Sequence, residues 1–376
     1  MKNFLPKEYK KNRKLKINHS YLVEQFADYT KIFKEVEKVV KKGDYTLGKE
    51  VDVCEKNFAK RTGAKYAISV GNGTDALLLT LKALNIGSGD EVITVPYTFI
   101  ATVGSIVTAG AKPVFVDIKE DYNMDENKIA TAITKKTKAI MPVHWAGRPC
   151  ELDKIYSIAK KYKLHVVQDS AHVIGARFKK KHLINFGDAC TYSMHPLKNL
   201  NVWGDGGFIV TNKKPLAKKL YLIRNHGLKN RNSIEIFGYN SRLDTIQAAV
   251  LNIKLKNYKK VIRIRNELAQ IYFDELQNLK QVKLFKLKNS NTYAFHQFVI
   301  RTSKRDQLAK YLKKNKIQTM VHYPYMLNEI RFFPKSKNLI KSKNLGKKIL
   351  SLPISEEHSK KDIKYIAKKI NFFFNS

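Results

Sequence analysis

Lys198 is the residue of this chain whose neighbours best suit it to act as a nucleophile. It lies in the stretch from Cys190 to Thr211, CTYSMHPLKNLNVWGDGGFIVT, where a polar loop separates two apolar runs. An amine enclosed by apolar groups loses the hydration that favours its charge, so its pKa falls and it can form a Schiff base with a carbonyl compound. On this stretch alone an ordinary loop lysine is the simpler interpretation, because the chain has 71 lysine and arginine residues.

A glycine-containing turn follows the apolar run at 64–70. Its sequence is GNGTD, from Gly71 to Asp75, and a predicted helix begins within it. Glycines let backbone N–H groups approach an anion, and a helix N-terminus favours negative charge, so the turn could bind a phosphate. The spacing is neither GxGxxG nor a P-loop, which argues against a dinucleotide or a nucleoside triphosphate. The local alternative is a plain helix cap by Thr74 or Asp75.

Two more chemically useful groups follow later apolar runs. The run at 90–95 is followed by Phe99, which offers an aromatic face, and the run at 164–168 is followed by Asp169 and then His172. A buried carboxylate is costly unless it is paired, and a protonated ring nitrogen is a suitable partner. Core packing or helix capping could explain each residue singly. Together with Lys198 and the phosphate turn, they are the parts that pyridoxal 5′-phosphate requires.

The elements that must position these residues alternate regularly along the chain. Apolar runs at 64–70, 90–95, 112–118, 138–144 and 164–169 are separated by segments with helical spacing. This pattern predicts an α/β fold, with a mostly parallel sheet sandwiched by helices. Ligands of such sheets bind beyond the carboxyl ends of the strands, which is where all the candidate residues lie.

The C-terminal part of the chain has a different pattern. A long helix is predicted over 244–276, followed by strands at 294–302 and 317–323 and a final helix after Ser359. We therefore expect two domains, a large cofactor-binding domain at 1–252 and a smaller α+β domain at 253–376. Near the start, helix 29–42 has an apolar face that includes Ile32, Phe33 and Val40.

Composition limits the classes of function. The three cysteines have unrelated spacings, so we expect neither disulfides nor a metal site, and no apolar run is long enough to span a membrane. A cytoplasmic location is expected. The net charge of +39 suggests an anionic partner such as nucleic acid. The basic residues are spread evenly, however, so we favour compositional drift and expect no nucleic-acid partner.

With these residues in place, the chain resembles the DegT/DnrJ-type nucleotide-sugar aminotransferases of aspartate-aminotransferase fold type I. The resemblance runs from about Tyr29 to the C-terminus. It rests on the motifs YTLGKEV, VGNGTDAL, VPYTFIATVGSI, QDSAHVIGA, SMHPLKNLNVWGDGG, RNHG, GYNSRLDTIQAAV, VHYP and SLPI.

The resemblance implies a role for each candidate residue. Lys198 would hold pyridoxal 5′-phosphate covalently, and Asp169 would pair with its ring nitrogen. The other implied cofactor-binding residues are Gly73, Thr74, Phe99, His172, Ser193 and Asn240, the last reaching the phosphate of a partner subunit in a homodimer. The implied substrate residues are His195, Arg242, His322 and Tyr323, although ordinary packing remains an alternative for the last three.

The implied reaction moves an amino group from glutamate to a keto sugar on a nucleotide diphosphate, for cell-surface glycan or lipopolysaccharide synthesis. The string Asn-Ser-Arg-Leu-Asp at 240–244, with Asp75, resembles members that aminate a 3-keto hexose. The alternatives are a 4-keto-sugar or cyclitol aminotransferase on the same scaffold and, more remotely, a basic nucleic-acid-binding protein. Related sugar dehydratases carry histidine in place of the lysine, so the presence of Lys198 argues against that activity.

Overall fold

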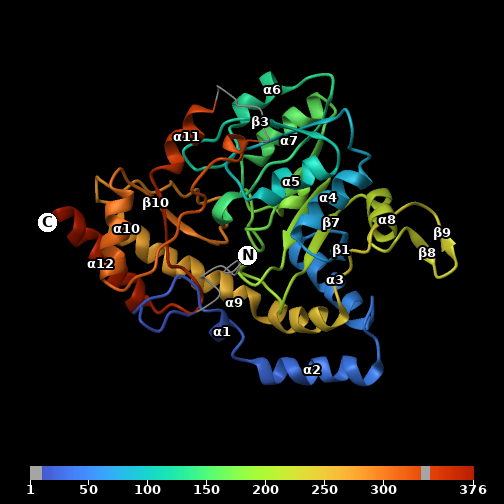
Figure 1. Ribbon diagram of the computed structural model, residues 1–376, viewed down its shortest axis with the longest axis horizontal. Helices are drawn as coiled ribbons and strands as arrows, with labels where there is room; N and C mark the ends of the chain where they lie inside the picture. Colours follow the sequence, from blue (N-terminus) through green and yellow to red (C-terminus); the bar gives the residue numbers. More distant parts are fainter. Residues whose placement is uncertain (1–10, 332–338) are drawn as a thin grey trace.

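A seven-stranded sheet lies at the centre of the computed structural model, which describes residues 11–331 and 339–376 (Figure 1). The strand order is β1-β7-β6-β5-β4-β2-β3. The strands are β1 (Tyr66–Val70), β2 (Glu91–Thr94), β3 (Lys112–Phe115), β4 (Thr137–Ile140), β5 (His165–Asp169), β6 (Ala189–Ser193) and β7 (Gly207–Thr211). The expected α/β fold is confirmed.

The sheet is mostly parallel. Strands β2 to β6 pair in parallel, while β7 runs antiparallel to both β6 and β1. The reversal at β7 places the loop 194–206, which carries Lys198, at the same edge as the carboxyl ends of β1, β5 and β6. The edge predicted to hold the chemistry is therefore formed by this loop and these strand ends.

Helices cover both faces of the sheet because its strands are apolar on both sides. Val166 of β5 packs in one apolar cluster with Phe58 and Ile155, whereas the next residue, Val167, packs with Leu77 in another. Alternate residues of a strand point to opposite faces, so each strand contributes to two cores. The helices before α9 are α1 (Leu22–Gln25), α2 (Tyr29–Lys42), α3 (Lys49–Thr62), α4 (Gly73–Ala83), α5 (Ile100–Thr108), α6 (Ile129–Ala132), α7 (Leu152–Lys161) and α8 (Lys214–Ile223).

The long helix α9 (Thr245–Leu276) connects the sheet to the C-terminal part (Figure 1). Its second half joins a separate apolar core with the elements that follow it. Those elements include β10 (Phe298–Arg301), α10 (Arg305–Lys314), α11 (Ile340–Gly346), β11 (Ile349–Leu352) and α12 (Lys360–Asn375). The domain boundary expected between residues 252 and 253 falls inside α9 and stays a prediction.

Two expectations for local structure are corrected. The segment 317–323 is not a strand, because it makes only isolated bridges, of Ile317 to Ile17 and of Met320 to Ser351. The partner of β10 is β11, a strand that the sequence pattern did not predict. In α2, Ile32 is buried but Phe33 is 57% exposed, so part of the expected inner face lies on the surface.

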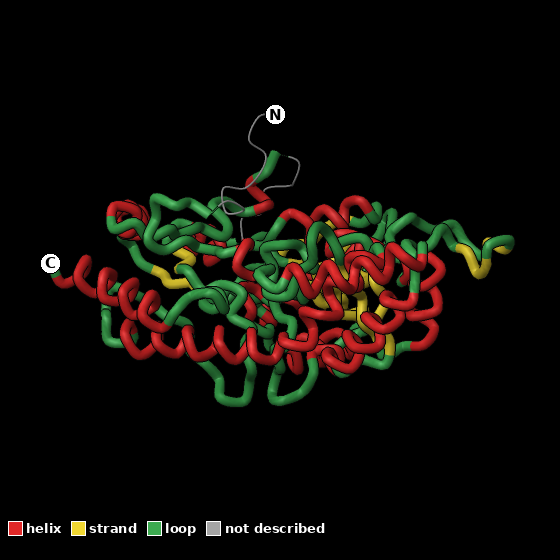
Figure 2. Tube along the Cα trace, turned by 90° about the horizontal axis from the view of Figure 1, so that it is seen from below, coloured by secondary structure: helices red, strands yellow, loops and turns green. Residues whose placement is uncertain are grey.

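Both ends of the molecule carry projecting elements. Seen from below, the hairpin of β8 (Leu228–Asn230) and β9 (Ser233–Ile234) extends from one end, and α12 from the other (Figure 2). None of the helices in the described ranges is long and apolar enough to cross a membrane.

Candidate active site

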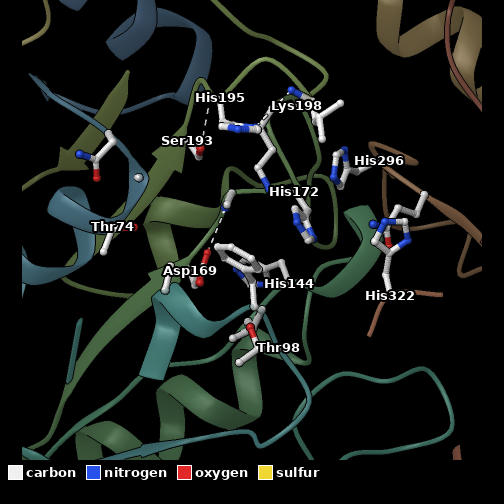
Figure 3. A pocket seen from close by; sticks show the side chains of 18 of the residues that line it. Thr74, Thr98, His144, Asp169, His172, Ser193, His195, Lys198, His296 and His322 are labelled. Carbon is white, nitrogen blue, oxygen red and sulfur yellow. Dashed lines mark hydrogen bonds between the residues drawn. The ribbon is translucent and has the colours of Figure 1, made fainter. Parts of the chain in front are cut away.

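A cavity of about 440 Å³ lies at the edge of the sheet where β5 and β6 end. Its wall combines strand ends, the loop 194–206 and segments from both termini. Figure 3 labels Asp169 and Lys198 around this cavity, together with His144, His172, His195, His296 and His322. The sequence-predicted residues that line it are Gly73, Thr74, Phe99, Asp169, His172, Ser193, His195, Lys198, His322 and Tyr323.

Lys198 is held in a loop that is closed on itself by backbone hydrogen bonds. Met194 N–H donates to Gly206 O at 2.7 Å, and Val202 N–H donates to Met194 O at 3.0 Å. Loss of water around the Lys198 ammonium lowers its pKa to about 8, and the Asp169 carboxylate only partly offsets this. With this pKa roughly a tenth of Lys198 is an uncharged amine at pH 7, far more than at the ordinary lysine pKa, and the uncharged amine is the nucleophile.

Asp169 ends β5 as a buried carboxylate with a defined set of donors. Thr102 Oγ1 donates to its Oδ2 at 2.7 Å, and Ala171 N–H donates to its Oδ1 at 3.2 Å. Burial raises the pKa of Asp169, while these bonds and the nearby Lys198 oppose the rise. Each carboxylate oxygen still has a lone pair that can accept another hydrogen bond.

The glycine turn and Ser193 form one compact surface. Asn72 caps α4 by accepting from Asp75 N–H at 2.8 Å. The amides of Gly73 and Thr74, in the same first turn, have no acceptor within the helix. A Cβ atom at Gly73 would lie 2.6 Å from Ser193 Cβ, so only glycine lets these two segments approach. The Ser193 hydroxyl accepts from His195 N–H at 3.3 Å, and this direction leaves its own proton for another acceptor.

Of four further predicted residues, two line the cavity and two do not. His322 lines the cavity, its Nδ1 bonded to Ser351 Oγ at 3.0 Å, and burial lowers its pKa to about 4. The backbone of Tyr323 is bonded at both N and O to the buried Tyr97 hydroxyl. Asn240 and Arg242 are absent from the cavity wall in the described part of the chain.

Comparison with known proteins identifies the family to which the chain belongs. The model of the DegT/DnrJ/EryC1/StrS aminotransferase family matches residues 27–371. The chain belongs to this family. It is therefore an aminotransferase, and its cofactor is pyridoxal 5′-phosphate.

Individual relatives are similar along most of their length. A pleiotropic regulatory protein of Geobacillus stearothermophilus is 40% identical over 91% of this chain and 94% of the relative. The dTDP-3-amino-3,6-dideoxy-alpha-D-galactopyranose transaminase of Aneurinibacillus thermoaerophilus is 38% identical over 89% and 93%. The UDP-2-acetamido-2-deoxy-3-oxo-D-glucuronate aminotransferase of Pseudomonas aeruginosa is 41% identical over 80% and 83%. The crystal structure of DesV from S. venezuelae has a TM-score of 0.93 at 32% identity, covering 96% of this chain and 99% of DesV.

The cavity of this aminotransferase fits its cofactor in shape and charge. The surface of Gly73, Thr74 and Ser193 combines close backbone approach, a helix N-terminus and a hydroxyl proton, which suits a phosphate. Phe99 lines the cavity with 54% of its surface exposed, so a face of its ring is open to a flat aromatic group. Asp169 and Lys198 add a buried carboxylate and an amine with a lowered pKa.

Several cavity residues escaped the sequence analysis. His144 could have been predicted, because it ends the apolar run at 138–144 and ligands bind at the carboxyl ends of such strands. It is fully buried, with Nε2 bonded to Gln168 Oε1 at 2.9 Å and Nδ1 accepting from Cys150 N–H at 3.1 Å. No comparable signal marks the others, because they come from distant segments that only the fold brings together. They include His19, Gln25, Arg265 and His296.

Thr102 offers a test of how the hydrogen bond to Asp169 affects cofactor binding in this aminotransferase. The Thr102 hydroxyl donates its single proton to Asp169. In the 2.8 Å hydrogen bond between the Thr98 and Thr102 hydroxyls, Thr98 is therefore the donor. Replacing Thr102 with valine keeps the shape, removes a hydrogen bond to a charged group and raises the pKa of Asp169 further. We expect pyridoxal phosphate to bind about tenfold more weakly, measured by fluorescence titration of apoprotein. Thr80→Val removes an equally buried hydroxyl, bonded to Ala76 O, and should leave this affinity unchanged; equal affinities in both variants would contradict the prediction.

Proposed function

We propose that this aminotransferase moves an amino group from glutamate to a keto sugar carried on a nucleotide diphosphate. The proposed position of the ketone is carbon 3 of a hexose, and the product would serve cell-surface glycan synthesis. The observation that carries the proposal is the single cavity that brings Lys198 and Asp169 together with the glycine turn. Two of the relatives support the substrate class, since their names specify a 3-amino and a 3-oxo nucleotide sugar.

Each catalytic step is assigned to a residue of this chain. Lys198 would hold the cofactor covalently and, once its amine is free, would transfer the substrate proton as general acid and base. Asp169 would keep the proton on the ring nitrogen. When bound, pyridoxal phosphate supplies an electron-withdrawing ring that stabilises negative charge on the reacting carbon. The glycine turn, Thr74 and Ser193 would bind the phosphate, Phe99 would pack on the ring, and His172 would lie near the phenolic oxygen.

The substrate-side assignments are His195, Arg242, His322 and Tyr323. His195 and His322 both have pKa values lowered first by burial and then by Lys198, so they are neutral and act as hydrogen-bonding groups. Arg242 donates to Asn225 Oδ1 at 3.0 Å outside the cavity wall. We assign it to the entrance of the site.

The proposed assembly is a homodimer with shared active sites. Asn240 is exposed and does not line the cavity of its own chain, as expected of a residue that serves a neighbouring site. Large apolar side chains beside it are also exposed, with Phe237 at 100% and Ile234 at 69%. Such side chains on one projecting segment favour a protein partner. Phe33 of α2 adds to the exposed apolar surface.

Mixing two inactive variants tests the shared site. Lys198→Ala and Asn240→Glu should each be inactive, the second because a carboxylate would face the cofactor phosphate. In a mixed dimer one site carries both changes and the other carries neither. Random exchange of subunits should therefore restore about a quarter of wild-type activity. If activity stays absent although mass measurement shows mixed dimers, Asn240 does not act across the interface.

The substrate is tested by screening keto sugars on several nucleotides and detecting the amine by mass. We expect amination of a 3-keto hexose on dTDP or UDP, with glutamate converted to 2-oxoglutarate. Preferential amination of a 4-keto sugar would correct the ring position. Amination of a keto-inositol but of no nucleotide-linked sugar would overturn the substrate class.

A further inference from the structure

His296 is a cavity residue whose protonated nitrogen can be identified from its neighbours. Its Nδ1 lies 3.0 Å from Asn199 Oδ1, and Asn199 Nδ2 donates to Ala294 O at 2.9 Å. The opposite amide orientation would bring two acceptor oxygens together at Ala294, so Oδ1 must face the histidine. An amide oxygen only accepts hydrogen bonds, and Nδ1 of His296 therefore carries the proton.

The other nitrogen of His296 is consequently an acceptor. Burial, followed by repulsion from His172 and Lys198, keeps the pKa of His296 well below its ordinary value. The ring is thus neutral near pH 7, and Nε2 has a lone pair. No hydrogen bond to Nε2 is found within residues 11–331 and 339–376, and this atom is not among the buried unpaired atoms, so it is open to the cavity that His296 lines.

The orientation of this acceptor is fixed from two sides. His172 covers the His296 ring, with a distance of 4.2 Å between ring centroids and an angle of 32° between ring planes. The two rings lie next to each other in Figure 3. A flip of the ring would break the bond to Asn199, which directly follows Lys198. The Nε2 lone pair is therefore held in a constant position relative to the Lys198 loop.

An acceptor in this position selects among the groups that enter the cavity. It repels carboxylates, which also only accept at neutral pH, and it attracts polar hydrogens. We propose that His296 is a substrate-binding residue that accepts a hydrogen bond, through Nε2, from a hydroxyl group of the keto sugar. This assignment rests on the proposed function. Within the protein, the Lys198 ammonium is the group that could donate a hydrogen bond to Nε2 instead of the sugar hydroxyl.

Two variants of His296 distinguish a sugar hydroxyl from the Lys198 ammonium as the hydrogen-bond donor to Nε2. Glutamine places its amide near the position of histidine Nε2, whereas asparagine places it near Nδ1. With the holoenzyme, the loss of cofactor absorbance is followed with two amino donors, glutamate and dTDP-3-amino-3,6-dideoxy-α-D-galactopyranose. In His296→Asn we expect the rate constant for the amino sugar to fall about tenfold or more, with glutamate within about twofold of wild type. His296→Gln should lose less.

The outcomes are distinguishable from failure of the proposed function. Equal loss with both donors would point to Lys198 and overturn the proposal, as would no loss with either. If wild-type protein reacts with glutamate but with no nucleotide sugar, the proposed substrate is wrong. A further measurement needs no substrate. In protein labelled with ¹⁵N-histidine at pH 7.5, the ring signals that disappear in His296→Asn should show protonated Nδ1 and bare Nε2. A proton on Nε2 would overturn the proposal.

Discussion

Replacing Lys198 with alanine is expected to abolish transamination, with a loss of about 10³-fold or more. The cofactor would lose both its covalent attachment and the group that moves the proton. The absorbance band of the lysine-bound cofactor should also disappear, although pyridoxal phosphate can still bind through its phosphate. In the wild type, borohydride reduction should fix the cofactor to the peptide that contains Lys198, as detected by mass.

The same change should not destabilise the fold. The pKa of Lys198 is lowered to about 8, so below that pH its charge is held in the folded state at a cost that the unfolded chain does not bear. Removing it should leave the melting temperature of the apoprotein at pH 7 unchanged or higher. Lys218→Ala on α8 is the matched control, since Lys218 is exposed, and it should keep the absorbance and activity. A Lys198→Ala protein that kept wild-type activity would refute the assignment.

The sequence was sufficient to predict the edge of the sheet where the chemistry lies. Parallel strands end at a common edge, so residues at separate strand ends, such as Thr74, Asp169 and Lys198, could be grouped without coordinates. Local patterns also located the β-strands around them, because buried strands are continuous apolar runs. The family resemblance then supplied roles that spacing alone left open.

The parts that could not be predicted depend on contacts between distant segments. His296 belongs to a segment that packs beside the Lys198 loop, where His296 is hydrogen-bonded to Asn199. Nothing in the sequence around His296 predicts this contact. The segment 317–323 was predicted as a strand, yet it makes only isolated bridges, and the partner of β10 is β11. Likewise, Phe33 continues the apolar pattern of α2 but lies on the surface. An apolar pattern therefore does not specify which segment packs against a side chain, or whether any segment of the same chain does.

Asp169→Asn is expected to lower transamination by about 10²-fold or more, because a neutral amide cannot hold the proton on the ring nitrogen. The volume of the side chain is nearly unchanged. The amide oxygen can still accept from Ala171 N–H, and the amide nitrogen can donate to Thr102 Oγ1, whose own proton can turn to Thr98. The readout is kcat for the complete reaction at saturating cofactor. The pyridoxal phosphate affinity of the apoprotein, measured by titration, should also fall.

Stability should respond to Asp169→Asn with opposite signs in the two forms of the protein. The pKa of Asp169 is raised in the folded chain, so stability is lost as the pH rises from its ordinary value through the raised one, and at pH 7 the ionised carboxylate destabilises the apoprotein. The asparagine variant should therefore melt at an equal or higher temperature without cofactor. With cofactor the order should reverse, because the wild type gains more stability from its tighter binding. A purely structural aspartate would shift both melting temperatures downward together, and that result would remove Asp169 from the catalytic site.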